Sequence, residues 1–391
     1  MTHEMDKAVR HVVEKQMAAG IDIGNDGEQQ RVGFQTYVPQ RMTGFAGVSK
    51  RRRGREFEEF PELVAMPDAA LSACQPRAAE RAGGAGRIEI SRHQADRATR
   101  SRASRRSPTS RRSAERFMTA PSPGIISSTM LNAYYDSHDA YLDAIAREMK
   151  NEYQAIHKAG LILQIDAPDL AMDRTMMYRD LDRRAVRQAL SSGTSRRSTR
   201  ASTGIPRDRV RLHVCYGNWE GPHIHDVPLG NNSAGALSRP MSARCRSSSP
   251  IRATRTNTLR SRSIRCRKHM LLIPGVVETT SNFRRASRRW WRVASRRRCA
   301  AVGDRERVIA STDCGFGTFT NREWVIEPAV WLKLAAIRAG RRYRLGEALG
   351  QEGRLNRDGD MRSLWLLQNP FWFSDRQRLI DGLRELMSQR G

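Results

Sequence analysis

The sequence predicts an α/β fold: a (β/α)8 TIM-type barrel that is incomplete and interrupted by Arg/Ser-rich segments. Three observations lead to this prediction. A unit of helix, short apolar strand and then polar residues recurs, several strands end in ligand-type side chains, and no glycine-rich phosphate fingerprint follows any strand. In a barrel, side chains at the carboxyl ends of all strands converge on one site. A doubly wound sheet is the alternative, and the absent fingerprint disfavours it.

The clearest unit is a helix followed by a strand. Apolar residues recur at intervals of three and four over 142–156, which is typical of an amphipathic helix. Gly160 is well placed to end this helix. The apolar strand predicted at 161–165 then brings Asp166 to its carboxyl end. A strand that is apolar on both faces is typical of a parallel sheet covered by helices.

The same succession of strand and polar residues occurs four more times. Strands are predicted at 21–23, 210–215, 271–273 and 308–310, and the polar or ligand-type residues that end or follow them are Asp26 and Glu28, His213 and Cys215, Glu278, and Asp313 and Cys314. We therefore expect one barrel domain over residues 1–339. The tail over 340–391 is unassigned, with an amphipathic helix predicted at 376–387.

The charge of the chain is unevenly distributed. The chain contains 69 Lys and Arg against 41 Asp and Glu, a net charge of +28, and the whole of this excess falls in four segments rich in Arg and Ser. These basic segments cover residues 81–116, 191–206, 231–268 and 284–299. They lack the periodicity of a core-facing helix or strand, so we expect irregular, insert-like segments in an otherwise near-neutral globular domain.

The basic segments have two interpretations. Arg/Ser-rich arms bind phosphates and usually stay disordered until bound, which would make this a nucleic-acid-binding protein. Alternatively, Arg, Ser, Ala, Thr and Pro are the residues that a GC-rich gene tends to yield when it is read out of frame. The abrupt ends of the segments favour this second interpretation. The coding DNA across 231–268 distinguishes the two.

Apolar runs and cysteines bear on the cell compartment. No apolar run approaches the roughly 20 residues of a membrane-spanning helix, and the charged start has no apolar signal core, so we expect a cytoplasmic protein without a membrane segment. Six cysteines in such a chain of 391 residues do not indicate a disulfide framework. Only Cys215 and Cys314 lie in well-patterned sequence.

A candidate metal site follows from the spacing of these residues. His213 and Cys215 are two residues apart on a predicted strand, which directs the imidazole and the thiol to one face. Cys314 follows a later strand and reaches the same point if the sheet closes or curls round. Two sulfurs and one nitrogen are a ligand set suited to zinc. A buried strand with an ordinary cysteine and a hydrogen-bonded histidine is the other interpretation.

Several segments, in this order, resemble the cobalamin-independent methionine synthase family, and are closest to its short, single-barrel members, the class that includes epoxyalkane:coenzyme M transferases. They are GIDIGNDGEQ, TGFAG, TAPSPGIISS, QIDAPDL, RLHVCYGNWEGPHIHD, LLIPGVVETTSNF and STDCGFGTF. The resemblance covers a little over half of the chain. Its most specific element is HxC on one strand and DCG on a later one, which together mark the family's zinc site.

The resemblance implies a site and a reaction. His213, Cys215 and Cys314 would bind Zn²⁺, Glu28 would bind the substrate's amino group, and Asp166 would be a second acid, catalytic and substrate-binding. The implied reaction belongs to methionine biosynthesis: methyl or alkyl transfer to a homocysteine-like thiol from a donor such as 5-methyltetrahydropteroyltri-L-glutamate. Zinc would favour the thiolate. From the residues alone, the alternative interpretations are that Glu28 is a solvated loop carboxylate and that Asp166 is a helix cap.

The sequence departs from the family in two places. The family has a further Glu ligand on a strand that falls at about residues 235–260, where this chain has no Asp or Glu, so we expect both this strand and its ligand to be lost. Glu278 belongs to the next strand, and His223 and His225 are loop residues that we do not expect to bind the ion. The family's first strand is also absent. These losses predict no detectable methyl transfer by the chain as written, so its competence as an enzyme is left open.

Overall fold

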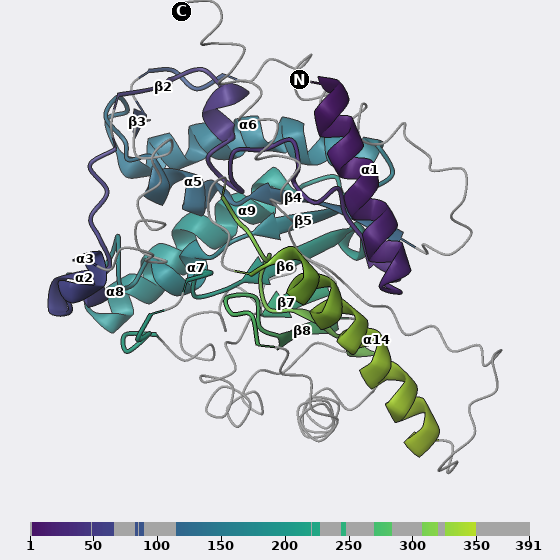
Figure 1. The fold of residues 1–391 in the computed structure, drawn as a ribbon. Coiled ribbons are helices and arrows are strands. Elements are labelled where there is room, and N and C mark those ends of the chain that lie inside the picture. Colours follow the sequence, from purple (N-terminus) through teal and green to yellow (C-terminus); the bar gives the residue numbers. More distant parts are fainter. Residues whose placement is uncertain are drawn as a thin grey trace, which may run out of the picture.

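A computed structural model describes the fold, with the parallel sheet at its centre (Figure 1). It describes residues 2–47, 49–65, 83–84, 86–89, 115–219, 221–226, 244–247, 270–283, 307–319 and 325–348. Within these residues, no helix is both long enough and apolar enough to cross a membrane.

Seven parallel strands form the main sheet, and their order in the sheet is their order in the chain. They are β1 (Ile23–Gly24), β4 (Glu115–Pro121), β5 (Ile162–Asp166), β6 (Val210–Val214), β7 (Arg244–Ser247), β8 (Leu271–Val277) and β9 (Ser311–Thr312). Two further strands, β2 (Phe45–Ala46) and β3 (Gly83–Gly84), pair antiparallel in a small separate sheet. The predicted mixed α/β class with a parallel sheet is confirmed. Sequential order of parallel strands is the arrangement that a (β/α)8 barrel requires.

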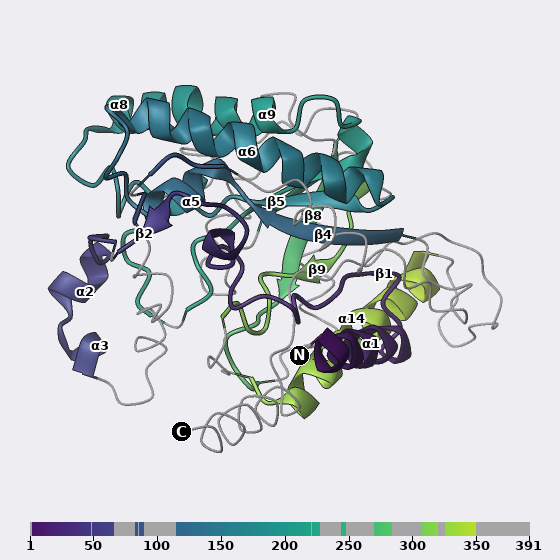
Figure 2. The ribbon, with the colours of Figure 1, turned by 90° about the horizontal axis from the view of Figure 1, so that it is seen from above.

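Helices lie on both sides of this sheet (Figure 2). The α-helices are α1 (Thr2–Ala18), α2 (Arg55–Glu59), α3 (Glu62–Ala65), α5 (Pro123–Thr129), α6 (His138–Lys158), α7 (Asp169–Met172), α8 (Arg183–Gln188), α9 (Arg196–Ala201) and α14 (Glu327–Ala348). Short 3₁₀ turns form at Val38–Gln40 (η1) and Arg207–Arg209 (η3), and a π-helical segment, η2, spans Ala189–Ser195. Helices α6, α8 and α9 cover one side, while α1 and α14 lie side by side on the other.

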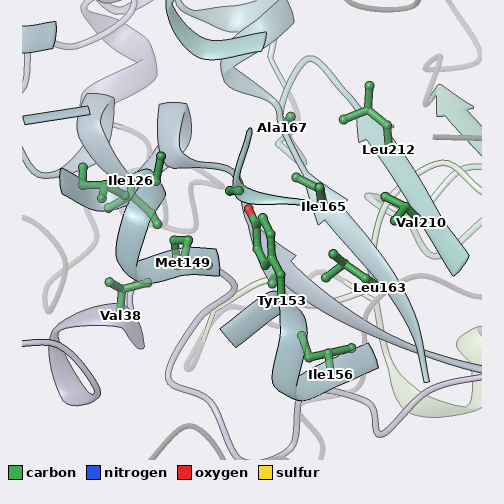
Figure 3. Packing of buried hydrophobic residues seen from close by; sticks show 14 of the residues in the cluster. Val38, Ile126, Met149, Tyr153, Ile156, Leu163, Ile165, Ala167, Val210 and Leu212 are labelled. Carbon is green, nitrogen blue, oxygen red and sulfur yellow. The ribbon is translucent and has the colours of Figure 1, made fainter. Parts of the chain in front are cut away.

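The core between α6 and the sheet confirms the helix and strand predicted around Asp166. Helix α6 buries the predicted apolar stripe, and Gly160 follows it with a left-handed φ of 76°. Tyr153 of α6 lies against Leu163 and Ile165 of β5 (Figure 3). Its hydroxyl donates a 2.7 Å hydrogen bond to the carbonyl of Pro121, which satisfies the one polar atom that this side chain buries.

The basic segment 191–206 is helical over residues 191–201, so the expectation of an irregular insert is wrong there. Helix α9 contacts α6 and buries Ser198 and Ala201. Arg197 forms ion pairs with Asp139 and Asp143 of α6, at 3.2 and 3.1 Å. Small side chains at a spacing of three allow close helix packing, and a search for apolar periodicity does not detect such a face.

A strand also forms within the most basic segment. β7 pairs in register with β6 and β8, so the expectation that this part of the sheet is lost is wrong. The ladder consists of backbone hydrogen bonds, which require no particular side-chain pattern. Segment 284–299 and the predicted helix at 376–387 lie outside the described residues. Helix α14 runs across residue 339, where we expected the barrel domain to end.

The two edge strands of the sheet, β1 and β9, approach each other, but among the described residues no ladder of backbone hydrogen bonds joins them. An isolated antiparallel bridge joins Gly33, which follows β1, to Phe319, which follows β9. An apolar cluster spans the same gap, because it contains Ile23 of β1 together with Ile273 of β8 and Ile309, which precedes β9. The sheet therefore curls so that its two edges share a core.

Candidate metal centre

Strand β6 places two of the predicted ligands. All five residues of β6 are buried, and Cys215 follows directly after it. His213 pairs with Asp166 at the carboxyl end of the neighbouring strand β5, and its carbonyl accepts a 2.9 Å hydrogen bond from the amide of Ala167. The alternation predicted from period 2 therefore brings the imidazole and the thiol to one end of the sheet.

Cys314 joins them from the segment after β9. The metal-binding atoms of His213, Cys215 and Cys314 all lie within 4.8 Å of one another, and all three residues are buried. The Cys314 sulfur is 4.0 Å from Nε2 of His213. The curled sheet thus brings together the three residues that the sequence singled out.

The geometry of these three residues fits a zinc ion. Nitrogen and sulfur ligands at about 2.0–2.3 Å from a tetrahedral zinc lie roughly 3.5–3.8 Å apart. The Cys314–His213 separation of 4.0 Å is close to this range, and the upper bound of 4.8 Å for all three pairs exceeds it by roughly 1.3 Å at most, a gap that small side-chain rotations can close. Two thiols and one imidazole are also the donors that zinc prefers over oxygen-seeking cations.

Glu28 lies in a buried pocket at the end of β1. Its side chain is fully buried, and Oε1 contacts Arg31, at 3.4 Å, and the hydroxyl of Thr119 on β4. Burial raises the pKa of Glu28 to about 8, with Arg31 opposing the shift and the nearby Asp166 and Asp26 adding to it. The 3.4 Å contact is too long to offset burial, so Glu28 is mostly protonated at neutral pH.

The backbone at Glu28 is in an unusual conformation. Its φ is +48°, a left-handed value that a non-glycine residue adopts at a cost of roughly 1–2 kcal/mol. Asp26 holds this turn, because its Oδ1 accepts a 3.0 Å hydrogen bond from the amide of Glu28. The turn directs the carboxyl group toward β4, so Glu28 is not the solvated loop carboxylate of the alternative interpretation.

Asp166 is buried at the carboxyl end of β5. Its Oδ1 accepts a 2.7 Å hydrogen bond from Nε2 of Gln164 on the same strand. The nearby α7 begins only at Asp169. The helix-cap interpretation therefore does not describe Asp166, which pairs with His213 in the sheet.

Other residues considered from the sequence lie in different hydrogen-bond networks. Glu278 accepts hydrogen bonds from Thr280 and Ser281 and contacts Lys333 at 3.4 Å. His223 pairs with Asp226, and His225 lies 2.7 Å from Glu59 on α2. The metal cluster found among the described residues includes none of the three.

Sequence reasoning missed the residues that hold Glu28. Arg31 donates to the Thr119 hydroxyl at 2.8 Å and to the Thr119 carbonyl at 2.7 Å, and its guanidinium lies over the ring of Tyr37. The spacing of three between Glu28 and Arg31 was a local signal of a pair. Nothing local indicated Thr119, which is distant in the chain.

Comparisons with known proteins show a likeness of fold. No protein-family model matches the chain, and no curated protein matches it. Among solved structures, it is similar to a B12-independent methionine synthase from Shewanella sp. W3-18-1 in complex with selenomethionine. The TM-score is 0.58 at 17% sequence identity, and the match covers 89% of each chain. This likeness supports the predicted barrel-type architecture.

Proposed function

We propose that this protein is a zinc-dependent transferase that moves a methyl or alkyl group onto the sulfur of a thiol. The observation that carries the proposal is the convergence of His213, Cys215 and Cys314 from two distant parts of the sheet. Two further findings support it. These are the residues to which the sequence resemblance assigns zinc, and the fold is similar to that of a methionine synthase.

In this proposal the two cysteines and the histidine hold the metal. Zinc would supply Lewis acidity that favours the thiolate form of a bound sulfur near neutral pH. Strand β7 has the sequence Arg-Cys-Arg-Ser, so it fills the place of the family's Glu-bearing strand without a carboxylate. Three protein donors are the number typical of catalytic zinc sites, which keep one position for substrate.

Glu28 and Asp166 would bind the amino group of a homocysteine-like thiol. Both are buried, Asp166 lies near enough to Glu28 to raise its pKa, and Asp166 pairs with His213 in the sheet, which supports an amino-group site next to the metal ligands. An ammonium group is the natural partner for this pair, because its positive charge stabilises the ionised form of both. Arg31 and Thr119 hold Glu28 from the opposite side.

The proposed donor is a methyltetrahydrofolate-like molecule. The thiolate sulfur would form a bond to the methyl carbon while the bond from that carbon to the donor nitrogen breaks, and this nitrogen then takes up a proton. The expected inactivity of the chain rested partly on a lost strand, and β7 removes that reason. The absent carboxylate remains, so we expect slow, zinc-dependent formation of methionine that a chelator abolishes.

Thiol binding can be tested without turnover. Cobalt(II)-loaded protein has thiolate-to-metal absorption bands from Cys215 and Cys314, and these bands gain intensity when an added thiol coordinates. This gain can be titrated with homocysteine and with 4-mercaptobutyrate, which lacks the amino group. We expect homocysteine to bind about 10- to 100-fold more tightly, as a hydrogen bond between charged groups contributes on the order of 1.5–3 kcal/mol. Glu28→Gln should remove most of this preference.

The controls separate the parts of the proposal. Glu58→Gln changes a carboxyl group on the exposed helix α2 and should leave the preference intact. Equal affinities for the two thiols in the wild type would contradict the role of Glu28. If neither thiol adds thiolate-to-metal absorption to the bands of the two cysteines, the metal-thiol function itself is contradicted.

A further inference from the structure

Three loops at the carboxyl end of the sheet meet at one buried threonine. Thr279, which follows β8, places Oγ1 2.8 Å from Oδ1 of Asp313 and 3.0 Å from Oδ1 of Asn218. Asp313 precedes Cys314, and Asn218 follows Cys215 by three residues. The Thr279 side chain therefore stands between the two segments that carry the cysteines.

The hydrogen bonds around Thr279 reach the cysteine backbone directly. Oδ1 of Asp313 accepts a 2.8 Å hydrogen bond from the amide of Cys314. Asn218 Nδ2 donates a 2.7 Å hydrogen bond to the carbonyl of Gly315, the residue after Cys314. Thr279 has a single hydroxyl proton, which it can donate to Asp313 or to Asn218 at any one time. The segment around Cys314 is thus linked to Thr279 through Asp313 on one side and to Asn218 through Gly315 on the other.

The backbone of Asp313 is also fixed against β8. Its amide donates a 2.8 Å hydrogen bond to the carbonyl of Val277. A Cβ on Gly275 would lie only 2.4 Å from Cα of Asp313, so the two strands approach as closely as a glycine permits. Asp313 therefore cannot move away from β8, and its carboxylate is held where Thr279 can reach it.

We propose that Thr279 is a positioning residue that sets the separation of Cys215 and Cys314 for the metal ion. This inference rests on the proposed function, because it takes the two thiols as ligands. Thr279 is fully buried and acts through Asp313 and Asn218 rather than by touching the metal. Groups that orient ligands in this way typically change metal affinity by about 10- to 100-fold when they are removed.

The test compares variants that differ in one hydroxyl group. Thr279→Val keeps the shape of the side chain and removes the hydroxyl, whereas Thr279→Ser keeps the hydroxyl. Thr199→Val is the control, because the Thr199 hydroxyl donates to the backbone carbonyl of Ser195, one helical turn earlier and away from the ligands. Zinc affinity is measured by competition with a chromophoric chelator, and cobalt(II) spectra report the ligand geometry.

We expect Thr279→Val to bind zinc about 10- to 100-fold more weakly and to shift the cobalt(II) bands, with Thr279→Ser and Thr199→Val close to wild type. Melting of the metal-free proteins serves as the stability readout. Wild-type affinity in Thr279→Val would overturn the inference. The inference would also be overturned if Thr199→Val, at the same loss of melting temperature, weakened zinc binding as much as Thr279→Val does.

A second variant covers the case in which Thr279→Val does not fold. Asn218 is only partly buried, and Asn218→Ala removes its hydrogen bond to Gly315. This variant should also bind zinc more weakly than wild type. Unchanged zinc affinity would overturn the inference. Failure of the proposed function gives a different pattern. In that case the wild type itself would bind no metal, whereas failure of this inference alone leaves wild-type binding intact.

Discussion

The Cys314 sulfur lies 4.0 Å from the His213 imidazole nitrogen Nε2, although two strands of the sheet separate the strands that carry these residues. In a flat parallel sheet, strands three places apart are roughly 14 Å apart. The contact therefore requires that the sheet curl at β7 and β8. Curvature of the sheet, and not nearness in the chain, creates the candidate metal centre.

Removal of either cysteine should remove the metal. We expect about one zinc per wild-type chain and little in Cys215→Ser or Cys314→Ser, because each change leaves two protein donors. Cys74→Ser is the control and should keep the metal. Atomic absorption on dialysed protein measures the content. Equal zinc in wild type and both ligand variants would refute the site.

Glu28 should make the stability of the metal-free protein depend on pH. Burial raises its pKa from an ordinary 4.5 to about 8, so between these values the folded chain binds more protons than the unfolded chain. The stabilisation is fully present below about pH 4.5 and is lost as the pH rises through 8, a change on the order of a few kcal/mol.

Urea unfolding between pH 5 and 8.5, in the presence of a chelator, measures this effect. Glu28→Gln should flatten the pH dependence over this range. Asp169, whose pKa burial raises to about 7, contributes in the same direction and accounts for a remaining slope. Glu58→Gln should change nothing, because the pKa of this exposed carboxyl group is lowered and it is ionised throughout. Identical slopes for wild type and Glu28→Gln would contradict the buried, protonated state.

Binding of an amino acid at neutral pH should release a proton from Glu28. The carboxyl group is mostly protonated at pH 7, and an ammonium group beside it favours ionisation. Methionine is the suitable probe, because it has no thiol proton of its own. Calorimetry in two buffers of different ionisation enthalpy should show close to one proton released by the wild type and none by Glu28→Gln. Buffer-independent heats in the wild type would argue against this role.

Gly275→Ala should separate β8 from β9. The added methyl group would lie 2.4 Å from Cα of Asp313, so we expect a loss of about 1–3 kcal/mol in unfolding free energy together with weaker zinc binding. Gly86→Ala is the control, because its Cβ would meet its nearest neighbour, Cα of Gly44, at 3.6 Å. Denaturant unfolding and zinc competition measure both effects. A variant as stable and as metal-binding as Gly86→Ala would contradict the close approach.

Restoring the reading frame of the basic segments distinguishes their two interpretations. If they are out-of-frame sequence, a version with the frames restored should be near neutral, should not bind duplex DNA at about 150 mM salt, and should keep its zinc. Fluorescence anisotropy with labelled DNA measures the binding. Retained, steeply salt-dependent affinity after this repair would favour the nucleic-acid-binding alternative.

The sequence by itself determined the local elements and the ligand types. The spacing of apolar residues predicted α6 and β5, and period 2 placed His213 and Cys215 on one face, because both signals depend only on neighbours in the chain. Prediction from the local sequence pattern failed at β7 and α9. β7 is held in the sheet by its backbone, and α9 packs through the small residues Ser198 and Ala201, so neither has a periodic apolar face that the sequence could reveal.

Only the tertiary structure decided which residues meet. That Cys314 reaches His213 follows from the curl of the sheet. Thr119 contacts Glu28 across 91 positions of sequence. Thr279 contacts Asn218, 61 positions before it, and Asp313, 34 positions after it. Each of these contacts depends on strand order and register. Side-chain spacing records periodicity along one element, and it contains no information on which other element will lie beside it.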